Sequence, residues 1–571
     1  MKNQEVVEIL NNIADILEIK KVEWKPIAYR KAARSIENLP KDIEDIYRKK
    51  GLDGITEVSG IGLGIGKKIA EYLDTGKIKE FDELKKTVPE SVVSMMEIPG
   101  LGPKKVSKLY KILKINSLGE LERAARFGKI RNLMGFGEKS EEDILMGIGL
   151  IKKGHERTLL GTVLPIANSI ADGLRNLKEV SKIDIAGSIR RKKDTVKDID
   201  ILVISKYPEK VMNYFAKLNN IKAVLAKGPT KSSVVLKEGI NCDLRVVGEK
   251  SYGGALAYFT GSKEHNIRMR QIAIKKGMKL SEYGLFDRKD KYICGKNEEE
   301  LYSKLGLPYV EPEMREDTGE LELKKMPKLI GYNEIKGDLH MHTTWSDGFN
   351  SAEDMVKAAI KKKYEYVAIT DHSKSAHVAN GMDEKRFKKY IEEIEKLKKK
   401  YKNEINILKG SEVDILKDGS LDYPNKILDK LDIVIASMHS GFRAGKNENT
   451  NRMIKAINSG KVNIIAHPTG RIINQRNPYE IDLNAVIKEA KENNVALEIN
   501  SYPSRLDLND TNIRLCIEND NKLVISTDSH SAKNLDFMIF GIAQARRGWA
   551  ESKNIVNAMP FERFIKFIGK K

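Results

Sequence analysis

Two aspartates separated by one residue begin a short apolar run, KDIDILVIS, at Asp198 and Asp200. Residues i and i+2 of a β-strand project to the same face, so a strand here would direct both carboxylates to one side. Asp243, in the strand-like run INCDLRVV, is a candidate third carboxylate from a neighbouring strand. In-line phosphoryl transfer uses two metal ions about 3.5–4 Å apart that share such acidic ligands. The three aspartates therefore predict a nucleotidyl-transfer site for two Mg²⁺ ions.

A glycine-serine pair and two arginines precede these aspartates in AGSIRRKK. Gly187 and Ser188 would make a turn that cradles a triphosphate, and a guanidinium of Arg190 or Arg191 would neutralise charge on the leaving pyrophosphate. A lone Asp-x-Asp is more often a solvated strand edge than a metal site. The ordered set of turn, arginines and three carboxylates favours nucleotidyl transfer over that interpretation.

Nine further side chains with metal-ligand chemistry follow apolar runs after residue 335. They are His340 and His342 in HMH, Asp347 in WSDG, His372 in TDH, Glu412 in GSEVD, His439 in SMHS, His467 in AHPTGR, and Asp528 and His530 in TDSH. An isolated histidine is usually structural, but six at the ends of apolar runs make that interpretation improbable. Mixed imidazole and carboxylate ligation suits two or three ions of manganese, zinc or iron, with manganese or zinc our expectation.

The elements that must position these ligands alternate along the chain. Strand-like runs occur at GDLHMH, YVAITDH, INILKGSE, DIVIASMH, VNIIAHP, VALEIN and LVISTDSH, and helical segments separate most of them. Seven such units predict a parallel βα barrel. Barrels of this kind place their chemistry at the carboxyl ends of the strands, which is where the histidines and acids fall.

The first 149 residues instead predict short helices with glycine-rich turns, with helices over 5–19 and about 27–39. Such turns occur at SGIGLGIGKK, with Gly60, Gly62 and Lys67, at PGLGPKK, with Gly100, Gly102 and Lys104, and at LMGFGEKS. Backbone N–H groups at the start of a helix bind phosphate without reading base sequence. These turns resemble helix-hairpin-helix motifs of repair enzymes and predict binding to the DNA backbone.

Residues 1–315 resemble family X DNA polymerases, those similar to DNA polymerase beta, and a further stretch, AYFTGSKEHNIRMRQ, carries this resemblance. The resemblance implies that Tyr258, Phe259 and Gly261 line the nucleotide sugar, and that Asn266 and Arg270 contact the nascent base pair. It also implies that Ser188 and Arg191 contact the triphosphate and that the three aspartates are the metal ligands. All three aspartates are present, so we expect an active polymerase.

The segments KPIAYRKAA and GKKIAEYLDTGKI resemble the small domain of the same family, which binds the 5′-phosphate of a gap. Lys25 and Tyr29 match the supporting contacts of that domain. Lys68 is placed by the resemblance at the lysine that forms a Schiff base with deoxyribose phosphate. That role requires a partly deprotonated amine, and a lysine that only neutralises phosphate is at least as good an interpretation.

The nine ligands after residue 335 resemble those of the PHP (polymerase and histidinol phosphatase) domain. By resemblance, the cluster activates water to hydrolyse phosphoesters. In a polymerase this implies 3′→5′ exonuclease action, with 3′-phosphatase and abasic-site cleavage as relatives of that activity. Arg471, just after His467, would hold a DNA phosphate or else be an ordinary surface arginine.

Together these patterns predict a multidomain protein with α+β and α/β parts. The expected domains are a helical gap-binding, lyase-like domain with helix-hairpin-helix at 1–83, a helical DNA-binding domain at 84–149, a nucleotidyltransferase palm at 150–248, a nucleotide- and base-pair-binding subdomain at 249–315, a linker at 316–334, and a PHP barrel at 335–571.

Composition limits the class of partner. The formal charge is +20, and residues 151–315 hold 32 basic and 20 acidic residues, which is more than half of the excess. A localised basic excess favours nucleic acid, although solvated surface lysines are the alternative. Three separated cysteines fit a reducing cytosol. The sequence contains no apolar run of about 18 residues, so we expect no membrane span. We therefore expect a cytoplasmic monomer without a membrane partner.

The predicted function is template-directed filling of short gaps in base excision repair, with trimming of 3′ ends. The expected partners are gapped or nicked double-stranded DNA with a 5′-phosphate, and deoxynucleoside triphosphates. Two alternatives remain: a metabolite nucleotidyltransferase fused to a histidinol-phosphatase-like domain, and an inactive DNA-binding scaffold. The helix-hairpin-helix-like turns argue against the first alternative, and the complete ligand sets argue against the second.

Replacing a palm aspartate tests the polymerase interpretation. Asp198→Ala or Asp243→Ala should abolish nucleotide addition, because each removes a ligand of the catalytic ions. The 3′ trimming activity should remain in both variants, because its ligands lie after residue 335. Extension of a gapped primer by either variant at the parent rate would show that the aspartates were wrongly assigned.

Overall fold

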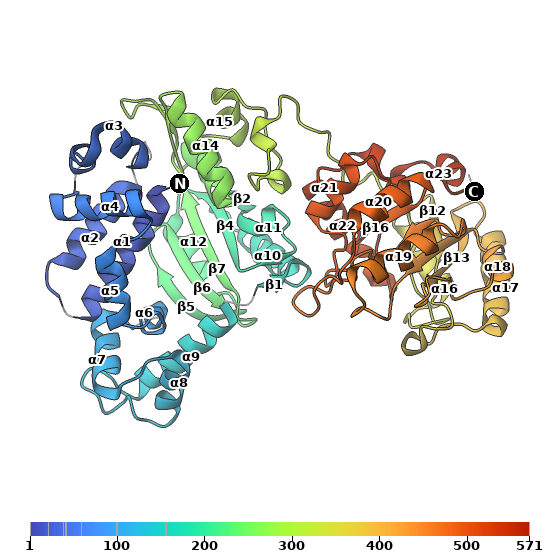
Figure 1. Ribbon diagram of the computed structural model, residues 1–571, viewed down its shortest axis with the longest axis horizontal. Coiled ribbons are helices and arrows are strands. Elements are labelled where there is room, and N and C mark those ends of the chain that lie inside the picture. The colour runs from blue at the N-terminus through green and yellow to red at the C-terminus, as the bar shows by residue number, and fades with distance from the viewer. Residues whose placement is uncertain are drawn as a thin grey trace. The chain divides into compact units, whose positions relative to one another are not determined.

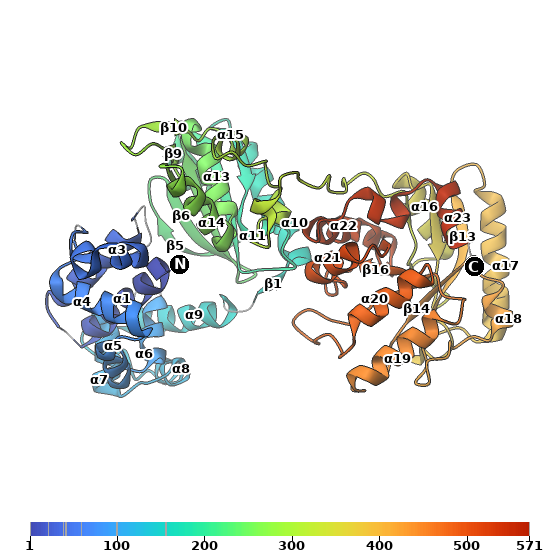
Figure 2. The ribbon, with the colours of Figure 1, turned by 45° about the horizontal axis from the view of Figure 1, so that its top comes forward.

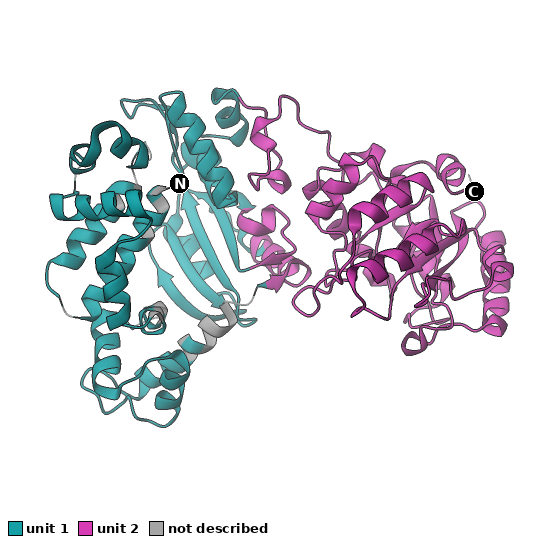
Figure 3. Cartoon of the chain, viewed as in Figure 1, with its two compact units in different colours: residues 1–157, 173–184, 197–306 teal, residues 158–172, 185–196, 307–571 magenta. Residues whose placement is uncertain are grey.

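The computed structural model describes residues 2–20, 22–37, 39, 43–58, 60–98, 101–154 and 157–569. Figures 1 and 2 show its helices and strands from two directions, and Figure 3 colours its two compact units separately. Unit 1 contains 1–157, 173–184 and 197–306, and unit 2 contains 158–172, 185–196 and 307–571. No helix of the described residues is long and apolar enough to cross a membrane.

The N-terminal part of unit 1 is helical, as expected. Its helices are α1 (Lys2–Ile19), α2 (Lys25–Glu37), α3 (Ile43–Thr56), α4 (Leu63–Thr75), α5 (Lys79–Thr87), α6 (Glu90–Val93), α7 (Pro103–Leu113), α8 (Leu118–Arg126) and α9 (Glu138–Gly154). Val6, Leu10, Ile13 and Leu17 recur at helical spacing on α1 and are buried in one apolar core. The first two helices begin two or three residues before the positions that the periodicity indicated.

Two of these helices begin directly after a glycine. Gly62 and Gly102 are the N-cap residues of α4 and α7, in extended conformation and without a side-chain cap. Both glycines are exposed, so the N–H groups of the first turn of α4 are available to an anion, whereas α7 begins with Pro103, which has no N–H. Gly60 has a φ of +92°, which favours glycine. Gly100 lies outside the described residues.

A five-stranded sheet forms the second part of unit 1. Its order is β2-β4-β7-β6-β5, with β2 Val180–Ile185, β4 Asp198–Ser205, β5 Ile221–Lys227, β6 Lys231–Leu236 and β7 Asn241–Val247. Strands β4 and β7 are parallel, and Asp200 is the register partner of Asp243. The expected pairing of the two acidic runs on neighbouring strands is therefore present.

Helix α12 (Pro208–Phe215) lies within this region of unit 1, and three small strands and three helices follow the sheet. They are α13 (Tyr252–Thr260), α14 (Lys263–Lys275), β8 (Lys279–Ser281), β9 (Gly284–Phe286), β10 (Tyr292–Cys294) and α15 (Glu298–Lys304). Ser262 caps α14, since its Oγ accepts from the His265 N–H at 3.2 Å. Gly261 ends α13 with a φ of +67°, so the turn between the two helices requires glycine.

Unit 2 contains the seven-stranded parallel sheet that the alternating pattern predicted. Its order is β11 (Gly337–Asp338), β12 (Tyr366–Ile369), β13 (Asn406–Asp414), β14 (Ile433–Ser437), β15 (Ile464–Ile465), β16 (Ala496–Asn500) and β17 (Leu523–Ser526). A parallel bridge between Met341 and Ser529 connects the chain after β11 to the chain after β17, so the sheet is nearly closed. The fold is a βα barrel.

Helices cover the outside of this barrel in Figures 1 and 2. They are α16 (Ala352–Lys361), α17 (Glu384–Lys400), α18 (Asn425–Leu428), α19 (Lys446–Ile457), α20 (Leu483–Glu492), α21 (Asp510–Glu518), α22 (Met538–Arg547) and α23 (Phe561–Ile568). One apolar cluster fills the space between sheet and helices, and a second includes Leu339, Ile433, Ile435 and Val524. The ends of the strands are therefore fixed from both sides.

Two details differ from the sequence-based expectation. Strand β11 ends at Asp338, so His340 and His342 follow the strand and do not lie within it. The segment 316–334, expected to be a linker, packs against the barrel: Leu321 and Ile330 are buried, and the Ile330 N–H donates to the Ala550 carbonyl at 2.9 Å. Its apolar residues explain this packing.

Ile435 is completely buried on β14 in the barrel interior, so truncating its side chain should destabilise the protein strongly. Ile435→Ala should lower the free energy of unfolding by about 2–5 kcal/mol, because it leaves a cavity. Ile539→Ala is the control and should change it by less than about 0.5 kcal/mol, because Ile539 is exposed.

Urea unfolding of the full chain measures this difference. Trp24→Phe leaves Trp345 and Trp549, both in unit 2, as the fluorescent reporters. Equal unfolding midpoints for Ile435→Ala and Ile539→Ala would contradict the assigned packing.

Candidate metal centre and nucleotide-transfer residues

All nine predicted ligands after residue 335 converge at the carboxyl ends of the barrel strands. Three overlapping groups hold ligand atoms within 4.8 Å of one another: His342, Asp347, His372 and His530; His340, His342 and Glu412; and His372, Glu412 and His439. His467 and Asp528 join them through contacts with Glu412 and His342, respectively. Residues almost 200 positions apart therefore form one cluster.

Glu412 is the centre of this cluster. Its carboxylate lies 2.9 Å from His372 Nδ1, 2.9 Å from His467 Nε2 and 3.3 Å from His439 Nε2. His340 Nε2 lies 3.4 Å away. Glu412 is only 1% exposed, so these imidazoles replace the water that would otherwise solvate its charge.

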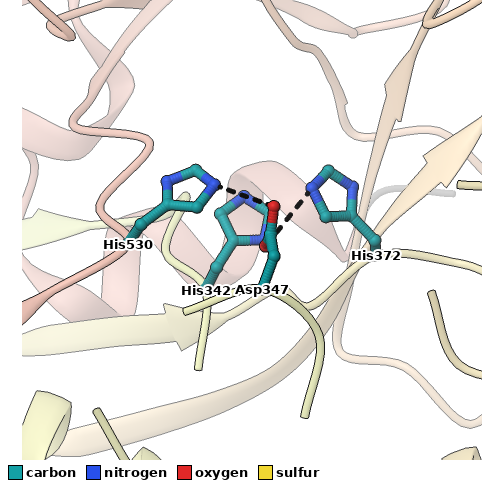
Figure 4. A group of neighbouring side chains, drawn as sticks. All are labelled: His342, Asp347, His372 and His530. Carbon is teal, nitrogen blue, oxygen red and sulfur yellow. Dashed lines mark ion pairs between the residues drawn. The ribbon is translucent and has the colours of Figure 1, made fainter. Parts of the chain in front are cut away.

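Asp347 and Asp528 hold the other side of the cluster. Asp528 Oδ1 lies 3.2 Å from His342 Nε2, and Asp347 Oδ2 lies 3.3 Å from His530 Nε2. Figure 4 shows His342 between His372 and His530, with Asp347 directed toward the group. His342 stacks on both neighbouring rings, with centroid distances of 4.3 and 4.5 Å.

The carboxylates control the charge of the imidazoles. Burial alone would lower the pKa of His439, but Glu412 and Asp414 raise this pKa to about 10. Burial also opposes the charge of His530, yet Asp347 and Asp528 raise its pKa to about 9. His342 behaves in the opposite way, because burial and the neighbouring His372 lower its pKa to about 3.

Two acids that the motif analysis missed orient the histidines. Glu498 Oε1 lies 2.7 Å from His340 Nδ1, and Asp414 Oδ1 lies 2.5 Å from His439 Nδ1. A carboxylate on the second ring nitrogen orients an imidazole and increases its basicity as a metal ligand. Asp414 was detectable, because it follows Glu412 at i+2 on β13; Glu498 in VALEIN carried no comparable signal.

The donor set fits metal ions. His340 Nε2, both ring nitrogens of His342, and His372 Nδ1 are buried, and although carboxylate oxygens lie 2.9–3.9 Å from them, none makes a hydrogen bond of good geometry. Buried polar atoms of this kind normally have partners, and a coordinated cation supplies one. Seven of the nine candidate ligands line a cavity of about 610 Å³, which Arg505 and Lys417 also line. The arrangement suits two or more cations beside a bound phosphoester.

The palm aspartates lie on one face of the sheet in unit 1. Asp198 and Asp200 alternate with buried Ile199 and Ile201 on β4, and Asp243 alternates with Cys242 and Leu244 on β7. Burial and the nearby Asp243 carboxylate raise the pKa of Asp198, although nearby cations oppose this shift. Lys231 Nζ lies 3.2 Å from Asp243 Oδ2, so a cation already balances part of this acidic group.

The expected nucleotide contacts are divided between the units. Gly187 (φ +64°) and Ser188 begin the short helix α11 (Gly187–Arg190) in unit 2, and Arg191 Nε lies 3.1 Å from Glu316 Oε1. In unit 1, one cavity is lined by Tyr258, Asn266 and Arg270, among others. Asn266 Nδ2 donates to the Tyr258 carbonyl at 2.6 Å, and the Arg245 guanidinium lies over the Phe259 ring.

Lys68 on α4 is in an ion pair. Its ammonium contacts the Glu80 carboxylate and donates to the Tyr29 hydroxyl. Burial would lower the pKa of Lys68, but these two partners raise it above the usual value. A raised pKa favours the cation that neutralises phosphate over the free amine that forms a Schiff base. Lys25, Lys67 and Lys104 are exposed, as DNA-backbone contacts require.

Arg471 is not an ordinary surface arginine, because it is largely buried. It is 12% exposed, and its Nη1 lies 3.2 Å from Asp194 Oδ2 within unit 2. Its Nη2 also donates to the Leu506 carbonyl. The guanidinium therefore connects the segment 185–196 to the barrel.

Comparisons with known proteins agree with this architecture. Family models match a helix-hairpin-helix domain at residues 1–78, a SAM-like helix-hairpin-helix tandem at 52–114 and 92–149, a DNA polymerase beta thumb at 255–316, and a PHP domain at 338–502. The chain is 42% identical to DNA polymerase/3′-5′ exonuclease PolX of Bacillus subtilis, over 99% of this chain and all of that protein.

Part of the chain also matches phosphatases. Over 173 residues, 29% of its length, the chain is 36% identical to the probable phosphatase YcdX of Shigella flexneri and of Escherichia coli, and covers 63% of each.

The charges of the cluster predict that metal binding depends on pH. Imidazole binds a metal only when neutral, and the raised pKa values of His439 and His530 keep both rings protonated near pH 7. Binding must therefore release protons, and the apparent affinity should weaken as the pH falls from about 9 to about 6.

Calorimetric titration of the metal-free full chain with Mn²⁺, in buffers of different protonation enthalpy, counts these protons. An observed enthalpy that is independent of the buffer would contradict the assigned charges.

Proposed function

Because the chain belongs to the family X DNA polymerases that carry a C-terminal PHP domain, we propose that it fills short gaps in DNA and trims 3′ ends by hydrolysis. The observation that carries the proposal is the presence of two separate acidic centres, the aspartates of β4 and β7 and the nine-ligand cluster of the barrel. The full-length relative, which is named DNA polymerase/3′-5′ exonuclease, supports both activities.

The polymerase proposal assigns each group of residues a role. Asp198, Asp200 and Asp243 would hold two Mg²⁺ ions, which supply the charge that stabilises in-line transfer to the nucleotide. Ser188 and Arg191 would bind the triphosphate, while Tyr258, Phe259 and Gly261 would contact the sugar. Asn266 and Arg270 would contact the new base pair. The ion pair between Lys231 and Asp243 keeps the acidic face balanced until cations enter.

Arg191 must exchange partners during this reaction. Its guanidinium contacts Glu316, and Glu316 also contacts Arg547 Nη1 at 3.0 Å. A triphosphate carries more negative charge than one carboxylate, so it can compete for Arg191. Arg547 leaves Glu316 with a cationic partner after the exchange.

We assign the DNA contacts to the helical part of unit 1. The exposed helix N-termini at Gly62 and Gly102, with Lys67 and Lys104, would bind backbone phosphates. Lys25, Tyr29 and Lys68 would bind the 5′-phosphate of a gap, and the raised pKa of Lys68 supports a charged contact. The substrates would be gapped or nicked duplexes and deoxynucleoside triphosphates, in a base excision repair reaction carried out by a monomer.

The hydrolytic proposal rests on the barrel cluster. The nine ligands would hold two or three Mn²⁺ or Zn²⁺ ions, which supply an activated water for attack on phosphorus. Glu498 and Asp414 orient His340 and His439, and Arg505, 3.4 Å from Asp528 Oδ2, is placed to bind a phosphate oxygen after displacement from that carboxylate. The phosphatase relatives support removal of a 3′-phosphate at the same centre.

The two centres should be separable. His340→Ala combined with His342→Ala should remove 3′ trimming, because it deletes two buried ligands, and should spare Mg²⁺-dependent gap filling. Lys374→Ala is the matched control, since Lys374 is exposed outside the ligand set.

Primer extension on a one-nucleotide gap and nucleotide release from a 3′-labelled strand measure the two activities on the same preparation. Normal trimming by the double variant, or loss of gap filling while the protein remains folded, would refute the proposal of two centres.

A further inference from the structure

Two apolar side chains are exposed beside the barrel metal centre. Phe349 is 82% exposed and Val378 is fully exposed. Phe349 is two residues after the ligand Asp347, and its N–H donates to the carbonyl of the ligand His530 at 2.7 Å. Val378 lines the same cavity as Asp347 and His530. Val378 therefore lies in the wall of this cavity, and Phe349 lies on a loop that is hydrogen-bonded to a predicted ligand.

Ordered loops hold these side chains in solvent. The Thr344 N–H donates to the Asn350 carbonyl at 3.0 Å, and Asn350 Oδ1 accepts from the Ala532 N–H at 3.0 Å. A Cβ at Gly348 would lie 2.5 Å from the His342 carbonyl oxygen, so the chain before Phe349 is closely packed. The exposure of Phe349 therefore results from a defined backbone and not from a loose loop.

The loop that carries Val378 is attached to the loop of Phe349. Asn380 Nδ2 donates to the Ser346 carbonyl at 3.0 Å. Arg386 Nη1 donates to the Asn380 carbonyl at 2.8 Å, and its Nη2 donates to the Trp345 carbonyl. One arginine thus joins both loops, which should keep Phe349 and Val378 in a fixed relation to the metal ligands.

The position of these residues points to one occupant. Single exposed apolar residues are common on protein surfaces. In the described part of unit 2, however, only four large apolar side chains are exposed, namely Tyr332, Phe349, Val378 and Ile539, and two of the four flank the metal centre. Nucleobases present apolar faces that stack on aromatic rings, and a phosphodiester held at the metals brings its own bases to these loops.

Charge around the cavity favours the same occupant. Arg505 and Lys417 line the cavity together with the ligands. Cationic side chains beside an aromatic platform form the usual arrangement for binding a single nucleic acid strand, with the backbone on the charges and the bases on the rings. An apolar segment of a partner protein would gain nothing from these charges.

We propose that Phe349 and Val378 contact the nucleobase of the terminal nucleotides at a DNA 3′ end, and thereby select base-bearing strands for hydrolysis. This inference rests on the proposed exonuclease function and assigns to it a substrate contact that the metal ligands do not make. Phe349 would stack on a base, and Val378 would contact the same strand from the second loop.

A substrate without bases separates this role from a structural one. The full chain with Mn²⁺ would be assayed on a single-stranded oligonucleotide and on one whose last two nucleosides are replaced by tetrahydrofuran abasic residues. Phe349→Ala should raise KM for the ordinary strand about tenfold, and Val378→Ala should raise it several-fold. Neither variant should change KM for the abasic strand, and both should retain the metal content of the parent.

Two further variants complete the design. Phe349→Tyr keeps an aromatic ring and should retain the parent KM on both strands. Ile539→Ala removes a different exposed apolar side chain, on α22 and outside the residues that line the cavity, and should have no effect.

An equal loss on both strands, or an unchanged KM for Phe349→Ala on the ordinary strand, would overturn the inference. If the parent protein trims the ordinary strand and Phe349→Ala does so with the same KM, the inference alone fails. If the parent protein releases nucleotides from neither strand, the proposed exonuclease function fails, and the inference fails with it.

Discussion

The position of Glu412 is the constraint on which the barrel depends. The buried Glu412 carboxylate lies 2.9–3.4 Å from ring nitrogens of four histidines, namely His340, His372, His439 and His467. Although burial opposes its charge, the surrounding imidazoles hold the pKa of Glu412 well below its usual value. Removing water from a charge is costly unless partners replace it, so each of these histidines must be held in place by the fold.

A parallel barrel satisfies this requirement because the carboxyl ends of all its strands meet at one edge. The nine predicted ligands come from seven separate runs of sequence at six of the seven strands, so no strand needs to deliver more than three side chains. The outer helices and the interior apolar cluster fix the strands from both sides, and contacts such as those of Glu498 with His340 and of Asp414 with His439 then orient individual side chains. The palm uses the same principle on a smaller scale, with two parallel strands that place Asp200 beside Asp243.

Sequence periodicity predicted the seven parallel strands and the neighbouring acidic strands of the palm, because alternation and strand length are local properties. It did not predict the hydrogen bond that His340 donates to Glu498 or the ion pair between Lys68 and Glu80, because both join residues on different elements. The packing of 316–334 against the barrel was missed for a related reason: its prolines and acids indicate a linker locally, while Ile330 is buried only in the folded unit. The roles of the nine ligands and of the palm residues remain predictions.

The central claim is that the barrel side chains bind cations directly, and anomalous diffraction at the manganese edge tests it most directly. Crystals of the full chain grown with Mn²⁺ should show two or three anomalous peaks within about 2.0–2.3 Å of the imidazole nitrogens and carboxylate oxygens of the cluster. At least one of these ions should lie within that distance of a Glu412 carboxylate oxygen. A cluster without anomalous density at saturating Mn²⁺ or Zn²⁺, with Glu412 still bonded only to histidines, would contradict the account.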